Sequence, residues 1–141
     1  MKFSELNLHP SLMEGLDAMG FEETTPIQEQ SIPDLIKGRD IVGCAQTGTG
    51  KTAAFLIPTI ERVLKSKNPG VKALVIAPTR ELAVQIDQQL QGLGYFAGIS
   101  SIAIYGGKDG TAWDFEKQSL QGGADVIICT PGRVIAHMGF D

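Results

Sequence analysis

The fold is decided by residues 41–52, which read Ile41-Val42-Gly43-Cys44-Ala45-Gln46-Thr47-Gly48-Thr49-Gly50-Lys51-Thr52. An apolar run leads into a glycine-rich turn, and a helical segment is expected after the turn. Glycines let backbone N–H groups wrap phosphate oxygens, the lysine ammonium reaches the β- and γ-phosphates, and the threonine hydroxyl completes a Mg²⁺ shell. The stretch therefore predicts a nucleotide-binding P-loop, although Ala45 stands where the general pattern has glycine.

The rest of the chain repeats the order of apolar run, turn and helical pattern. Apolar runs at residues 73–77, 102–105 and 126–129 join the run at residues 41–44. Strands that are apolar on both sides and alternate with helices form a parallel sheet with helices on both faces. The fold class is therefore α/β, with a P-loop domain over residues 41–141 and a helical arm over residues 1–40.

Composition limits what the chain can do. Its 141 residues, 43% apolar and 20% charged, point to one compact domain, and no run suits a membrane helix or a signal peptide. A cytoplasmic protein is expected. The net charge of -4 argues against binding nucleic acid by bulk charge, so any polyanion site must be local. Cys44 and Cys129 have no metal-ligand spacing and are expected to be reduced core residues.

The turns that follow the predicted strands supply such a local site. The C-terminal ends of parallel strands meet at one edge, where ligands bind and helix N-termini favour anions. Besides the P-loop, three turns carry a cation: Pro78-Thr79-Arg80, Gly106-Gly107-Lys108 and Thr130-Pro131-Gly132-Arg133. We expect this edge to hold phosphates. The alternative is structural: the threonines cap helices, Pro131 starts one, and the paired glycines make a tight turn.

The arm contains a glutamine with two possible roles. A helix is predicted to begin at Thr25-Pro26 and to be bent or split by Pro33. Gln28 has the spacing of a capping box, in which its amide bonds back to the N–H of the cap residue. The same amide offers a donor and an acceptor together, which matches the N6/N7 edge of adenine. Phe21 could then stack on the base, and the residues alone leave both roles open.

Taken together, these motifs resemble the N-terminal RecA-like domain of the DEAD-box RNA helicases. Five segments carry the resemblance in order: residues 20–28 are similar to the Q motif, 45–52 to the P-loop, 78–83 to motif Ia, 106–107 to the double-glycine motif and 130–133 to motif Ib. Phe3 stands where the family has an isolated upstream aromatic residue. The family's P-loop begins with alanine, so Ala45 supports the resemblance.

The resemblance implies ATP or ADP with Mg²⁺ as cofactors and RNA as partner. Nucleotide binding is implied for Phe21, Gln28, Ala45, Gln46, Thr47, Gly48, Thr49, Gly50, Lys51 and Thr52. Within that set Gln28 selects adenine, Lys51 and Thr52 serve catalysis, and Thr52 assists the metal. Backbone contacts to one RNA strand are implied for Pro78, Thr79, Arg80, Gly106, Gly107, Thr130, Pro131, Gly132 and Arg133.

The resemblance also implies parts that these residues do not include. The family hydrolyses ATP with an Asp-Glu-Ala-Asp segment, which does not occur in the 141 residues, and with a second RecA-like domain. We therefore expect this chain alone to bind nucleotide without hydrolysing ATP or unwinding RNA. The alternative is a stand-alone, non-hydrolysing nucleotide- or RNA-binding module. An incomplete RecA-like sheet also leaves residues 41–44 without a neighbour, so an exposed edge or pairing with a second copy is expected.

Four further residues are expected to have no functional role. His9 and His137 belong to no partner pattern. Trp113 and Phe115 are predicted to be core residues rather than platforms for base stacking.

Overall fold

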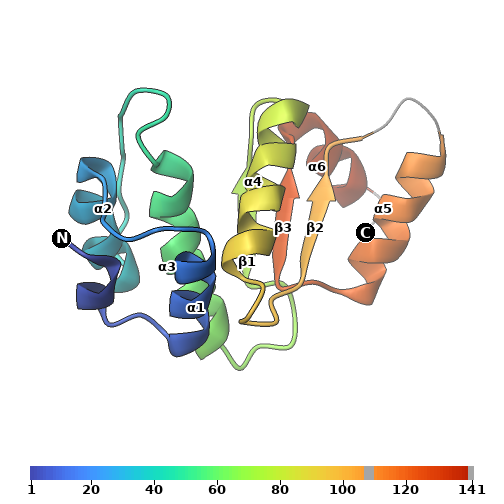
Figure 1. Cartoon of the computed structure of the whole chain (residues 1–141). Helices are drawn as coiled ribbons and strands as arrows, with labels where there is room; N and C mark the ends of the chain where they lie inside the picture. Colours follow the sequence, from blue (N-terminus) through green and yellow to red (C-terminus); the bar gives the residue numbers. More distant parts are fainter. Residues whose placement is uncertain (107–109, 140–141) are drawn as a thin grey trace. The chain divides into compact units, whose positions relative to one another are not determined.

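The structure, a computed structural model, describes residues 1–106 and 110–139, without the side chains of residues 110 and 111 (Figure 1). The chain forms two compact units. One comprises Met1–Ser66 with Gln89–Ile99, and the other Lys67–Gln88 with Ser100–Asp141. In the described part of the chain, no helix is long and apolar enough to cross a membrane. The domain boundary at residue 40 and the cytoplasmic location stay predictions.

The first unit is helical. It contains a short 3-10 helix η1 (Phe3–Leu6), α1 (Pro10–Ala18), α2 (Pro26–Ile36), α3 (Lys51–Lys65) and the last turn of α4 (Arg80–Leu93). Its core is formed by fully buried apolar side chains, among them Phe3, Leu12, Leu16, Ile32, Leu56, Ile57, Ile60, Leu90 and Leu93. Gly15 of α1 lies against the Leu93 carbonyl, and a Cβ at Gly15 would collide with that backbone. This close approach lets α1 and α4 share one core.

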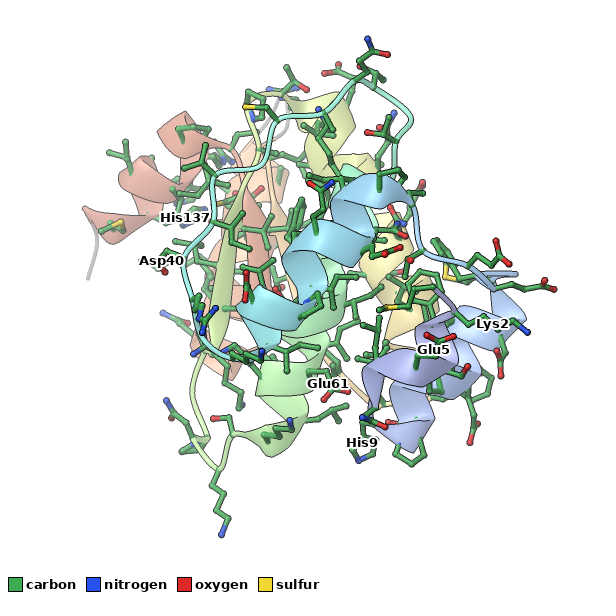
Figure 2. The ribbon with its side chains drawn as sticks, turned by 90° about the vertical axis from the view of Figure 1, so that its left-hand side faces the viewer. Lys2, Glu5, His9, Asp40, Glu61 and His137 are labelled. Atoms are coloured by element: carbon green, nitrogen blue, oxygen red, sulfur yellow. The ribbon has the colours of Figure 1, made fainter. Side chains whose placement is uncertain are left out.

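The starts of α1 and α2 are fixed by local chemistry. His9 caps α1, because its Nδ1 accepts from the Ser11 N–H at 3.2 Å. The buried Glu61 of α3 accepts from the His9 N–H, and Figure 2 shows the two residues near each other at the end of α3. As predicted, α2 begins at Pro26, directly after Thr25. The helix continues through Pro33 and is not split there.

The second unit contains a parallel sheet of three strands. These are β1 (Ala73–Ile76), β2 (Ser101–Ile104) and β3 (Val126–Cys129), in the order β1-β3-β2. Val126 is in register with Ala73 on one side and with Ser101 on the other. The strands are joined by α4 and by α5 (Gly110–Gly122), and α6 (Pro131–Met138) follows β3. Since α4 and α6 lie on opposite faces of the sheet in Figures 1 and 2, the predicted α/β arrangement is confirmed.

The predicted strand at residues 41–44 is wrong for the structure described. This segment pairs with none of the described strands, and 37% of Ile41 and 94% of Val42 are exposed. The physical reason is that an apolar run becomes a strand only where a neighbour accepts its backbone hydrogen bonds. Cys44 is consequently exposed instead of in the core, whereas Cys129 is buried, and both are free thiols. Pairing of residues 41–44 with a second copy stays a prediction.

Candidate functional site

Gln28 lies buried in the first turn of α2 and makes two hydrogen bonds. Its Oε1 accepts from the Thr25 N–H at 2.9 Å, as the predicted capping box requires. Its Nε2 donates to the Gly50 carbonyl at 3.1 Å, and only 1% of Gln28 is exposed. The glutamine therefore does more than cap a helix, because it also ties the arm to the glycine-rich loop.

Gly50 is the residue at which the arm and the loop meet. Its φ of 85° lies in the left-handed region that favours glycine, and Gly48 has a φ of 83° beside the exposed Thr47. A Cβ at Gly50 would collide with Gln28 Nε2 and would lie 3.0 Å from Thr25 Oγ1. The glutamine can reach the loop only because position 50 has no side chain.

Lys51 and Thr52 form the first turn of α3. Lys51 Nζ donates back across the loop to the Ala45 carbonyl at 2.6 Å, and Thr49 Oγ1 donates to the Gln46 carbonyl at 2.6 Å. Lys51 is exposed and Thr52 is half-buried. Backbone N–H groups at a helix start, an ammonium and a hydroxyl are the groups that bind a nucleotide phosphate and its Mg²⁺. The residues present therefore fit the predicted cofactors.

Phe21 lies in the arm after α1 and is half-buried. Its ring packs edge-to-face on Phe3, with 5.8 Å between the centroids and 82° between the planes. Both rings line a hollow together with Met13 and the charged side chains of Lys2 and Asp17. Phe21 is thus held by the arm core on one side, and its stacking on adenine stays a prediction.

The ends of the three strands bring the other predicted segments to one edge of the sheet in the second unit. Residues 78–80 follow β1, Gly106 follows β2, and residues 130–133 follow β3. Because all three strands are parallel, these segments leave the sheet on the same side. Gly107 and Lys108, which were predicted for this edge, lie outside the described residues.

The side chains at this edge differ in their hydrogen bonding. Thr79 Oγ1 accepts from the Leu82 N–H at 3.2 Å, so the capping role of this threonine is confirmed. Thr130 precedes α6 and makes no capping bond with its side chain. Five residues of the edge are exposed, namely Pro78, Thr79, Arg80, Pro131 and Gly132. Arg80 therefore presents a cation to solvent at the start of α4.

Arg133 is held within a cluster of side chains. Its Nε donates to Glu116 Oε1 at 2.8 Å, and its guanidinium lies 4.8 Å from the centre of the Trp113 ring. His137 Nε2 lies 2.8 Å from the same Oε1, and its ring stacks on Trp113 with 3.9 Å between centroids. The Gly106 N–H donates to the other oxygen, Oε2, at 2.9 Å. One carboxylate of α5 thus joins the turn after β2 to two side chains of α6.

Burial and pairing act on Glu116 in opposite directions. Burial raises the pKa of its carboxyl group, whereas hydrogen bonds from His137, Arg133 and the Gly106 N–H, together with the Arg133 charge, lower it. The lowering contributions prevail, so the pKa lies below the ordinary value of 4.5. Glu116 is therefore an anion at neutral pH, and its charge is paired inside the protein.

Sequence reasoning missed Glu116 and His137 as parts of the site. The only signal available was helical spacing, which puts Trp113 with Glu116 and Arg133 with His137 on common helix faces. Nothing in that spacing says that the two faces meet. Phe115 was predicted to be in the core, and this is wrong, because it lies on another side of α5 with 69% of its surface exposed.

Residues 25–140 match the family model described as DEAD/DEAH box helicase. The chain belongs to this family. Its DEAD-box relatives include the ATP-dependent RNA helicase CshA of Geobacillus kaustophilus, 48% identical over 138 residues, and that of Listeria monocytogenes, 44% identical over 137 residues. These matches cover 96% and 97% of this chain but only 28% and 26% of the relatives.

Two solved structures have the same fold. A DEAD box protein from the hyperthermophile Methanococcus jannaschii superposes with a TM-score of 0.89 at 37% identity, covering 99% of this chain and 37% of that one. A hypothetical ATP-dependent RNA helicase from Sulfolobus tokodaii gives a TM-score of 0.83 at 29% identity, covering 94% and 37%. The RecA-like fold expected from the motifs is thereby confirmed.

Proposed function

We propose that this chain is the ATP- and RNA-binding portion of a DEAD-box ATP-dependent RNA helicase. It spans about a quarter of the length of the curated relatives it matches, so the activity of the whole protein belongs to this proposal. The proposal that the chain binds nucleotide rests on one observation, the hydrogen bond from buried Gln28 to the Gly50 carbonyl. It places an amide that suits adenine directly at a loop that suits phosphates.

The nucleotide site draws on the arm, the loop and α3. The loop N–H groups and Lys51 would hold the phosphates, and Thr52 would ligate Mg²⁺, which screens phosphate charge when it is bound. To reach a phosphate, Lys51 must leave the Ala45 carbonyl. Each end of the Gln28 amide makes one bond, to Thr25 and to Gly50, and keeps a second N–H and a second lone pair that could bind adenine. Adenine would then contact the side chain that also joins the arm to the loop.

RNA is proposed to bind at the edge of the sheet in the second unit. Arg80 is exposed there, and α4 and α6 both begin at this edge with N–H groups suited to phosphates. Contacts of this kind hold a strand by its backbone and read no sequence. The proposed role of the 141 residues is therefore to position RNA and nucleotide. We propose no hydrolysis by them alone, because they contain no Asp-Glu-Ala-Asp segment.

Competition binding tests the proposal that the chain binds adenine nucleotides. A fluorescent ADP analogue is displaced from the unsubstituted chain by ATP and by GTP, and we expect ATP to compete better. Gln28→Glu keeps an acceptor for the Thr25 N–H but cannot donate to adenine, so the preference for ATP should disappear. Gln30→Ala, an exposed position on the same helix, is the control and should retain it. Equal competition by GTP against the unsubstituted chain would show that no base is read.

Removal of the Lys51 ammonium tests the proposal that the glycine-rich loop binds phosphates. Lys51→Ala should lower the affinity for ATP much more than the affinity for adenosine, because only ATP carries the phosphates that the ammonium would contact. Unchanged ATP affinity in this variant would contradict the assignment of the loop.

A further inference from the structure

Glu116 connects two segments that follow different strands. Its Oε2 accepts from the N–H of Gly106, two residues beyond the end of β2. Its Oε1 accepts from Arg133 Nε and lies 2.8 Å from His137 Nε2, both on α6 after β3. Only 5% of Glu116 is exposed, so these bonds are shielded from competing water. The carboxylate therefore fixes the Gly106 turn and the start of α6 against each other.

Aromatic stacking completes the same connection. The rings of Trp113 and His137 are nearly parallel, with 5° between their planes, and the Arg133 guanidinium lies over the Trp113 ring as well. His137, labelled in Figure 2, is only 7% exposed. The face of α5 that carries Trp113 and Glu116 thus packs against the face of α6 that carries Arg133 and His137.

This geometry occupies Arg133 Nε and shields Nη2, two of the three guanidinium nitrogens. Arg133 Nε is bonded to Glu116, and Nη2 is shielded from solvent and has no hydrogen-bond partner among the described residues. Its charge is balanced by a carboxylate 2.8 Å away. The position of a Cβ on Gly106, whose φ is 82°, would lie 3.3 Å from Arg133 Nε, so the arginine also packs closely on the turn. Arg80, by contrast, is exposed and at the start of its helix.

We infer that Glu116 and Arg133 are positioning residues for RNA binding, and that Arg133 acts through its bond to Glu116 and not as a phosphate ligand. The inference rests on the proposed RNA-binding function. The segments that flank the bond, Gly106 and residues 130–133, are those proposed to contact the RNA backbone. Because the Glu116 bonds order both segments before RNA binds, less conformational entropy is lost on binding. Glu116 therefore strengthens binding of a polyanion, although it is itself negative.

The salt dependence of RNA binding distinguishes a positioning residue from a phosphate ligand. A fluorescein-labelled oligouridylate is titrated with the 141-residue chain by anisotropy, between about 50 and 200 mM salt. Loss of one phosphate contact lowers the slope of log affinity against log salt by about 0.7 for a single strand. Arg80→Gln should show this decrease. Arg133→Lys and Glu116→Gln should weaken binding roughly tenfold, as expected for loss of a charged hydrogen bond, with the slope unchanged.

Arg133→Lys is the decisive variant, because lysine keeps the charge but loses the planar group that binds Glu116 and stacks on Trp113. It also keeps the chain testable if Glu116→Gln does not fold. Asp114→Asn removes an exposed negative charge from the same helix and is the matched control, with RNA affinity expected to be unchanged or slightly higher. Emission of Trp113, the single tryptophan of the chain, reports directly whether each variant disturbs the cluster. It should change in Arg133→Lys and Glu116→Gln and remain constant in Asp114→Asn.

Other outcomes would contradict either the role assigned to Arg133 and Glu116 or the proposed RNA binding. Full affinity in Arg133→Lys would overturn the inference, because the charge alone would then suffice, and a lower slope in Arg133→Gln would make Arg133 a phosphate ligand. Stronger RNA binding by Glu116→Gln would overturn it too, because the carboxylate would then only repel RNA. If the unsubstituted chain does not bind the oligouridylate, or Arg80→Gln has no effect, the proposed RNA-binding function itself fails. The inference then falls with it.

Discussion

Replacing Gly50 with alanine should destabilise the protein far more than the same replacement at Gly48. Both residues have a left-handed φ, 85° and 83°, so both variants carry the same backbone cost. That cost is about 1–2 kcal/mol and is partly offset by about 0.4–1 kcal/mol of lost unfolded-state entropy, which leaves about 1 kcal/mol. The surroundings differ, because a Cβ at Gly48 has no heavy atom within 4 Å, whereas one at Gly50 collides with Gln28 Nε2.

The collision adds a second cost at Gly50. Moving the Gln28 amide breaks its 3.1 Å bond to the Gly50 carbonyl and leaves a buried donor unpaired. An unpaired buried polar group costs about 1–3 kcal/mol, so the free energy of unfolding of Gly50→Ala should be about 3 kcal/mol below that of the unsubstituted chain. With an m-value of about 2 kcal/mol/M, its urea midpoint should lie about 1 M below that of Gly48→Ala.

Urea unfolding followed by far-UV circular dichroism measures both midpoints. A double-mutant cycle then identifies the cause: in a Gln28→Ala background the amide is gone, so most of the excess cost of Gly50→Ala over Gly48→Ala should disappear, and only the 3.0 Å contact of the Cβ with Thr25 Oγ1 remains. Equal midpoints of the two single variants, or an excess cost at Gly50 that is undiminished without the Gln28 side chain, would refute the proposed contact between Gln28 and the loop.

Three further predictions concern other parts of the chain. Gly15→Ala should lower the midpoint of thermal unfolding strongly, since its Cβ meets the Leu93 backbone, which cannot rotate away as a side chain can; an unchanged midpoint in calorimetry would contradict this packing. The pKa of Glu116 is lowered in the folded chain, so its stabilising contribution is fully present above the ordinary value of 4.5 and is lost as the pH falls through the lowered value. Urea midpoints should therefore decrease less on acidification in Glu116→Gln than in the unsubstituted chain, and parallel pH profiles would count against the assignment. A thiol reagent such as dithionitrobenzoate should label the exposed Cys44 quickly and the buried Cys129 only after urea is added. Cys44 is followed in Cys129→Ser and Cys129 in Cys44→Ser, and rapid labelling of both variants without urea would contradict the burial of Cys129 in β3.

Local patterns in the sequence predicted those features that depend on neighbouring residues. Proline in the first helical position marked the starts of α2 at Pro26 and of α6 at Pro131, and both helices begin there. Runs of apolar residues bounded by turns marked the three strands of the sheet. The same rule failed at residues 41–44, because the rule describes a strand's composition and not the neighbour that it requires.

The sequence by itself determined the α/β class, the P-loop segment and membership of the DEAD/DEAH box helicase family, since these follow from residue type, spacing and order along the chain. Only the tertiary structure decided that Gln28 also contacts Gly50 and what Glu116 contacts. The bond from Gln28 to Gly50 joins residues 22 positions apart, and the bond from Glu116 to Arg133 joins residues 17 apart on two helices. Contacts of this range depend on how packed elements approach each other in space, and neither helical spacing nor residue type contains that information.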